Sequence, residues 1–172
     1  MTSADQVSVR PAIPEDLGIL TEFSLAMAWE TERRALDRSR LQLGIQSVIE
    51  QSERGLYFVA NLRQQEQADT VTVGQLLITY EWSDWRNAQF WWIQSVFVHP
   101  MWRRKGIYRR MHQTITDIAH TRADVCGIRL YVEANNRMAK HVYQRVGLVP
   151  SHYEVYEKDF VLPPIDNTPN TP

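Results

Sequence analysis

The sequence predicts a mixed α/β fold in which a β-sheet is covered by helices. Segments that alternate apolar and polar residues, as strands do, are interspersed with segments whose apolar residues recur at helical spacing. The chain has 172 residues, of which 44% are hydrophobic and 23% charged, and these values are typical of a globular protein with one domain. We therefore expect residues 1–160 to form a single domain around one hydrophobic core.

The N-terminal half is predicted to contain a strand, two helices and a hairpin. Residues 6–13 alternate as a strand does and end at Pro14, after which Glu15 and Asp16 favour a helix start because acidic side chains complement the helix dipole. The two helices are expected at residues 17–29 and 40–53, and the hairpin strands at residues 56–62 and 71–82. The polar segment RQQEQAD is expected to join those two strands.

The C-terminal half is predicted to continue with alternating strands and helices. A strand at residues 90–98 stops before Pro100, because proline donates no hydrogen bond to a sheet. Gly106 precedes a helical pattern, and Gly147 is placed to cap a second one. The further expected elements are helices at residues 107–119 and 135–146 and strands at residues 128–132 and 152–160. Residues 161–172 contain four prolines and little to bury, so we expect a disordered tail.

Composition argues against several functional classes. No stretch approaches the roughly 20 apolar residues of a membrane-spanning helix, and the first ten residues lack the features of a secretory signal. The single cysteine, Cys126, cannot form a disulfide within the chain, so a cytoplasmic location is expected. The net charge of -1 favours neither nucleic acid nor a membrane surface as a partner. The five histidines show no metal-ligand spacing, so we expect no metal site.

A cluster of basic residues marks the turn before the helix at residue 107. Its members are Arg103, Arg104, Lys105, Arg109 and Arg110, and no acidic residue lies among them. A helix N-terminus presents unpaired N–H groups, and a glycine such as Gly106 lets an anion approach the backbone. The pattern predicts an anion site, although such a cluster alone also fits a solvated helix start. The G-x-x-x-x-G-K-[ST] pattern of a P-loop is absent.

Two sequence blocks resemble those of the GNAT family of N-acetyltransferases. The first is Val96-Phe97-Val98-His99-Pro100 followed by Arg103-Arg104-Lys105-Gly106-Ile107-Tyr108, which is similar to V-x-V-x-P and Q/R-x-x-G-x-G/A. The second is formed by Asn136, Ala139, Tyr143, Gly147 and Leu148, which match N-x-x-A-x-x-x-Y-x-x-x-G-F/L. Tyr108 departs from the first pattern by replacing its second glycine, and we expect its side chain to point into the helix packing.

The resemblance implies a mostly antiparallel sheet with helices on both faces and splayed central strands, between which acetyl-CoA binds. The residues it assigns to acetyl-CoA are Val96, Phe97, Val98, Arg103, Arg104, Lys105, Gly106, Ile107, Tyr108, Arg109, Asn136 and Ala139. It implies that Tyr143 protonates the leaving sulfur and that a backbone N–H near Phe97 faces the oxyanion. Some members carry a glutamate where this chain has Trp92, so Glu133, Glu30 or a water relay is expected to take the proton from the amine.

The expected activity is acetyl transfer to a primary amine of a small-molecule or peptidic acceptor. We expect Glu30, Trp82, Asp84 and Trp85 to form an acidic and aromatic pocket for a cationic amine. Alternatively, Glu30 pairs with Arg33 or Arg34 on an exposed helix face. The alternative function is a sensor module of the same fold that binds acyl-CoA without turnover. A homodimer is a further expectation, based on the frequency of dimers among proteins of this fold.

Overall fold

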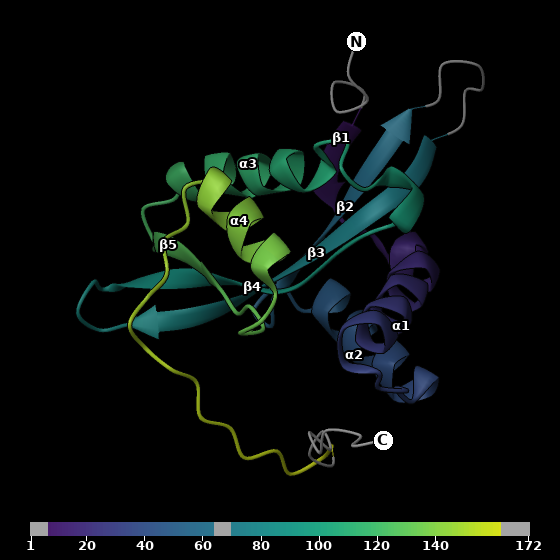
Figure 1. Ribbon diagram of the computed structural model, residues 1–172, viewed down its shortest axis with the longest axis horizontal. Helices are drawn as coiled ribbons and strands as arrows, with labels where there is room; N and C mark the ends of the chain where they lie inside the picture. The colour runs from purple at the N-terminus through teal and green to yellow at the C-terminus, as the bar shows by residue number, and fades with distance from the viewer. Residues whose placement is uncertain (1–6, 64–69, 163–172) are drawn as a thin grey trace.

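The computed structural model describes residues 7–63 and 70–162 and contains one five-stranded sheet (Figure 1). Its strands lie in the order β1-β2-β3-β4-β5, and every neighbouring pair is antiparallel except β4 and β5, which run parallel. The strands are β1 (Val7–Pro11), β2 (Leu56–Arg63), β3 (Thr70–Ser83), β4 (Ala88–Val98) and β5 (Val125–Leu130). The fold is therefore the mixed, mostly antiparallel α/β fold that the sequence predicts.

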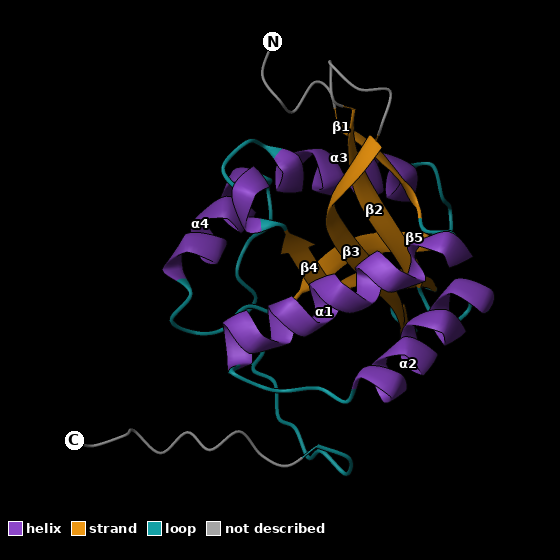
Figure 2. Ribbon diagram, turned by 90° about the vertical axis from the view of Figure 1, so that its right-hand side faces the viewer, coloured by secondary structure: helices purple, strands orange, loops and turns teal. Residues whose placement is uncertain are grey.

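Helices cover both faces of the sheet (Figures 1 and 2). They are α1 (Leu17–Glu32), α2 (Arg38–Glu50), α3 (Ile107–His120) and α4 (Arg137–Arg145), with short 3-10 turns at η2 (Pro14–Asp16) and η3 (Pro100–Trp102). Successive side chains of strand β2 point to opposite faces of the sheet and so pack in two separate cores. Phe58 and Ala60 pack in one core with α3, whereas Tyr57 and Val59 pack in a second core with α1 and α2. None of the helices in the described residues is long and apolar enough to cross a membrane.

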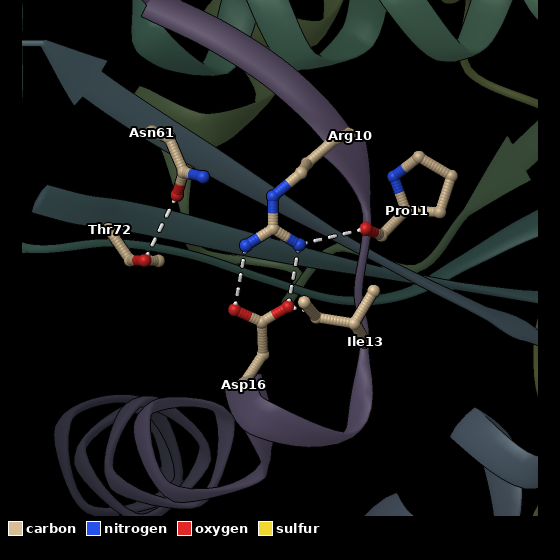
Figure 3. A network of polar contacts seen from close by, with 6 residues as sticks. All are labelled: Arg10, Pro11, Ile13, Asp16, Asn61 and Thr72. Carbon is tan, nitrogen blue, oxygen red and sulfur yellow. Dashed lines mark hydrogen bonds and ion pairs between the residues drawn. The ribbon is translucent and has the colours of Figure 1, made fainter. Parts of the chain in front are cut away.

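An ion pair between a half-exposed arginine and a buried aspartate fixes the entry into α1 (Figure 3). Two nitrogens of Arg10 on β1 donate to the carboxylate of Asp16 at 2.7 and 2.9 Å, and the N–H of Ile13 donates to the same carboxylate at 2.8 Å. Burial by itself raises the pKa of Asp16, but the hydrogen bonds and charge of Arg10, with the Ile13 N–H, lower it overall. This contact holds the start of α1 against the first strand.

Most predicted elements are present, with boundaries shifted by a few residues. The prediction of a strand at residues 152–160 is wrong, because residues 149–162 form neither strand nor helix and lie exposed. Alternating residues become a strand only when a neighbouring strand accepts their hydrogen bonds, and none does so within the described part of the chain. Residue 6, most of the segment that joins β2 to β3, and residues 163–172 of the predicted tail lie outside the described residues.

Candidate functional site

The turn between β4 and α3 exposes the N-terminus of a helix. Gly106 has φ 79° and Arg104 has φ 62°, so two left-handed residues reverse the chain directly before Ile107 begins α3. Among the described residues no side chain caps α3, and its first turn contains no acidic residue. Its first N–H groups and the positive end of its dipole are therefore available to an anion.

Arg103 anchors this turn to the rest of the molecule. Its Nε donates to the carbonyl of Val98 at 2.8 Å, and its two terminal nitrogens donate to the Glu30 carboxylate on α1 at 2.5 and 2.6 Å. The guanidinium also lies 5.4 Å from the ring centre of Phe97. Hydrogen bonding from Arg103 lowers the pKa of Glu30, so this carboxylate stays ionised at neutral pH.

The remaining basic residues of the cluster keep their charges exposed. Arg104, Arg109 and Arg110 are exposed and have no ion-pair partner within residues 7–63 and 70–162. Lys105 lies 4.3 Å from the ring centre of Trp102 and is exposed as well. Arg103 thus positions the turn, while its neighbours provide positive charge beside the open end of α3.

The two central strands diverge directly before this turn. Strand β5 pairs with β4 only from Gln89 to Ile93, and the later residues of β4 pair with β3 alone. Opposite Leu77 and Ile78, β4 carries one extra residue, Gln94, whose amide donates to Thr79 Oγ1 at 2.9 Å. The predicted splay of the central strands is confirmed, and among the described strands none pairs with β4 residues 94–98 on the β5 side.

Tyr143 and Tyr108 meet between α4 and α3. Their ring centres are 5.6 Å apart with an edge-on arrangement, and Tyr108 lies 5.9 Å from His112. The prediction that Tyr108 points into the helix packing is confirmed. Burial raises the pKa of both tyrosines, so both hydroxyl groups remain protonated at neutral pH. The Tyr108 hydroxyl and His112 Nε2 are buried without a hydrogen-bond partner in the described structure.

Asn136 and Glu133 shape the connection from β5 to α4. The Asn136 side chain accepts a hydrogen bond from the Ala139 N–H at 3.0 Å and thereby caps α4. Both oxygens of Glu133 lie 2.9 Å from the Asn135 N–H, and the side chain is exposed. The carboxylate of Glu133 therefore stabilises a turn near the splayed strands.

The residues predicted to bind the acceptor do not lie together. Glu30 contacts Arg103 beside Val98, at the end of β4. Trp82, by contrast, pairs with Gln89 at the other end of β4, roughly 25–30 Å away along the strand. Asp84 and Trp85 form the turn beyond it, in which the Asp84 carboxylate accepts from the Trp85 N–H at 2.9 Å. Trp82 and Trp85 are 60% and 85% exposed, so the four residues form no common pocket.

A polar and aromatic cluster that the sequence patterns did not indicate lies beside the splay. The Trp92 indole N–H donates to Glu81 on β3, and Arg129 on β5 donates to the same carboxylate at 2.7 Å. Arg129 also stacks 3.6 Å from the ring centre of Phe90, and Tyr131 lies 4.3 Å from that of Trp92. Only the strand register could have revealed that a carboxylate adjoins Trp92. Among the described residues, no group of three metal-binding side chains is present.

Comparisons with known proteins agree with this geometry. The model of the Acetyltransferase (GNAT) family matches residues 22–148. A possible acetyltransferase from Clostridium difficile 630 is 35% identical, with a TM-score of 0.81 over 91% of this chain and 99% of the other. An integron cassette protein from the mobile metagenome of Cole Harbour Salt Marsh is 19% identical, with a TM-score of 0.74 over 95% of each chain.

The aminoglycoside N-acetyltransferase AAC(6')-Iy, solved in complex with CoA, is 11% identical and shares the fold, with a TM-score of 0.69 over 90% of this chain and 95% of the other. No curated protein sequence matches the chain.

Proposed function

The chain belongs to the GNAT family of acetyltransferases, and on this premise we propose that it transfers an acetyl group from acetyl-CoA to a primary amine. The acceptor is a small molecule or a peptide, and the amine attacks the thioester directly while both substrates are bound. The divergence of β4 and β5 directly before the open N-terminus of α3 carries the proposal. This arrangement places unpaired backbone groups next to an anion site. The backbone groups suit the extended amide arm of acetyl-CoA, and the anion site suits its pyrophosphate.

The proposed acetyl-CoA site has two parts. The backbone of Val96, Phe97 and Val98 would pair with the amides of the pantetheine arm, since no strand in the described part of the chain pairs with that side of β4. The pyrophosphate would accept hydrogen bonds from the turn at residues 103–108, near the exposed charges of Arg104 and Arg109. Asn136 and Ala139 form the capped start of α4 and complete the proposed site.

Tyr143 is proposed as the acid that protonates the departing sulfur. In the reaction a C–N bond forms at the acetyl carbon, the C–S bond breaks, and the resulting thiolate takes a proton. Tyr143 retains its proton at neutral pH because burial raises its pKa. Its hydroxyl makes no hydrogen bond within the described residues, so it is free to donate to a bound substrate.

Glu133 is proposed to accept the proton of the amine, directly or through water. Its carboxylate is exposed in the connection that follows β5, near the point where the central strands part. Glu81 adjoins Trp92, but Arg129 neutralises its charge and both of its oxygens accept hydrogen bonds. Within residues 7–63 and 70–162, the Glu133 carboxylate has no ion-pair partner and accepts hydrogen bonds only from the Asn135 N–H, so the geometry favours Glu133 over Glu81.

A thiol-release assay with acetyl-CoA and a panel of amines tests the proposal. The panel contains polyamines, amino acids, aminoglycosides and peptides, and the expected result is amine-dependent release of free CoA thiol with at least one class. A second candidate function rests on Tyr108, whose ring stands where the family pattern has a glycine. Binding of acetyl-CoA in calorimetry without turnover of any amine would favour that candidate, an acyl-CoA sensor of the same fold.

A further inference from the structure

The polar and aromatic cluster beside the splay lies on one face of the sheet and is named here the splay cluster. Its members are Glu81 on β3, Phe90 and Trp92 on β4, Arg129 on β5 and Tyr131 directly after β5. Their neighbours in the chain point the other way, into the core that includes residues of α3: Tyr80, Trp91, Ile93, Ile128 and Leu130. The splay cluster therefore lies on the face of the sheet opposite α3.

The splay cluster is accessible to solvent, although α1 and α2 pack on the same face. Leu77, which precedes Glu81 on β3, packs in the core with α1 and α2. The Glu81 side chain, by contrast, is 41% exposed, and Tyr131 is 49% exposed. The β3–β4 hairpin extends away from α1 and α2 (Figure 1), so these two helices do not cover the splay cluster. A dissolved molecule can therefore reach it.

Arg129 is held in one orientation and keeps donors for a ligand. Its Nη1 donates to the Glu81 carboxylate at 2.7 Å, and its guanidinium stacks 3.6 Å from the ring centre of Phe90. Its Nε and Nη2 have no hydrogen-bond partner within residues 7–63 and 70–162, and its side chain is 33% exposed. The N–H groups of a fixed guanidinium edge match the two oxygens of a carboxylate.

Glu81 is less suited to bind a cation than Arg129 is to bind an anion. The two oxygens of Glu81 already accept hydrogen bonds, one from Arg129 and one from the Trp92 indole N–H. The rings of Trp92 and Tyr131, with centres 4.3 Å apart, add apolar surface beside the guanidinium. The splay cluster thus combines unused donors with an aromatic surface, which suits an organic acid better than an inorganic ion.

The position of the splay cluster relates this acid to the proposed reaction. Trp92 pairs with Arg129 one residue before the last pair of β4 and β5, Ile93 with Leu130. The pantetheine arm is proposed to run from the turn at residues 103–108 along residues 96–98, so the thioester would lie at the end nearest the splay cluster. About two or three residues of strand, roughly 7–10 Å, separate that end from Arg129. An acceptor of this length would reach both places.

We propose that Arg129 binds a carboxylate of the acceptor, so that the substrate is an amine whose carboxylate lies several bonds away. Amino acids with a side-chain amine and short peptides with a free C-terminal carboxylate belong to this class. Trp92 and Tyr131 contact the chain between the two groups, and Glu81 is a positioning residue that holds Arg129. The identity of the ligand as the acceptor rests on the proposed acetyl transfer, whereas the carboxylate site itself does not.

Steady-state kinetics with matched acceptors test the role of the carboxylate. The pairs are ε-aminocaproate with ε-aminocaproamide, L-lysine with L-lysinamide, and triglycine with triglycinamide. We expect kcat/KM to be at least about tenfold higher for the carboxylate member of at least one pair, because only that member forms charge-assisted hydrogen bonds with Arg129. Equal kcat/KM values within every pair would overturn the proposal.

Variants of Arg129 connect that preference to this side chain. Arg129→Gln should reduce the preference to within about twofold and leave the KM of acetyl-CoA unchanged, whereas Arg129→Lys keeps the charge and should retain part of the preference. Arg122→Gln provides the control, because Arg122 pairs with Asp124 outside the splay cluster and is 49% exposed. A preference that persists in Arg129→Gln would contradict the assignment.

A binding measurement separates this inference from the proposed acetyl transfer. Proton–nitrogen NMR spectra of the arginine Nε–H groups are recorded with and without CoA, and the Arg129 signal is identified by its loss in Arg129→Lys. We expect ε-aminocaproate to shift that signal and ε-aminocaproamide to leave it in place. A shift without acetylation of any amine would support the carboxylate site and reject acetyl transfer. No shift with any of the three carboxylates would overturn the site, even if amines are acetylated.

Discussion

Replacing Glu30 by glutamine distinguishes two roles for this residue. The sequence suggested that Glu30 binds a cationic acceptor, whereas the structure pairs it with Arg103, which holds the turn before α3. If Glu30 positions that turn, Glu30→Gln should weaken binding of acetyl-CoA and leave the KM of the acceptor nearly unchanged. If Glu30 binds the amine, the acceptor KM should rise instead.

The size of the effect follows from the exposure of the ion pair. The side chains of Arg103 and Glu30 are 38% and 48% exposed, so solvent screening reduces their pairing to about 1 kcal/mol despite its bidentate geometry. Removing a negative charge near a phosphate site has an opposite effect, which for a separation of about 10 Å in water is about 0.4 kcal/mol for each phosphate charge before screening by salt. The loss of positioning is larger, so we expect the Kd of acetyl-CoA to rise about three- to fivefold.

Calorimetry for acetyl-CoA and steady-state kinetics for the acceptor measure the two outcomes. Glu32→Gln provides a matched control, because Glu32 lies on the same turn of α1 but pairs with Arg34 at 3.7 Å and not with Arg103. An unchanged Kd for acetyl-CoA together with a raised acceptor KM would refute the positioning role and return Glu30 to the acceptor site.

Three further changes test other parts of the structure. Gly106→Val places a branched side chain at φ 79°, so we expect a stability loss of about 1–2 kcal/mol and an affinity for acetyl-CoA at least about tenfold lower. Unchanged affinity in calorimetry would contradict the anion site. Tyr143→Phe should lower kcat by roughly 10- to 1,000-fold, alter the basic limb of the pH profile and leave the Kd of acetyl-CoA within a few-fold. The control Tyr80→Phe should retain activity. Full activity of the Tyr143 variant at every pH would show that this residue serves only in packing. Asp16→Asn should cost about 2 kcal/mol in urea unfolding at neutral pH. The pKa of Asp16 in the folded protein lies below its ordinary 3.8, so this contribution is present above pH 3.8 and disappears as the pH falls through the folded pKa. The free energies of unfolding of variant and parent should therefore converge in acid. A difference that stays constant with pH would argue against the ion pair.

The sequence by itself determined the features that depend on neighbouring residues. Alternation and helical spacing predicted the sheet and the four helices, because these periods reflect which side of an element is buried. The glycine before Ile107 and the surrounding basic residues predicted the open helix N-terminus, since both act within one turn of chain. The two family blocks predicted the splay of the central strands, and the register of β4 and β5 bears it out.

Only the tertiary structure decided which distant residues meet. Strand register places Glu81 beside Trp92 and puts Trp82 at the opposite end of β4 from Glu30, and register is a relation between strands that neither segment encodes alone. The approach of α1 to the end of β4 pairs Glu30 with Arg103, although 73 positions separate them. Residues 152–160 illustrate the same dependence on tertiary contacts, because their sequence favours a strand but no strand within residues 7–63 and 70–162 accepts their backbone hydrogen bonds.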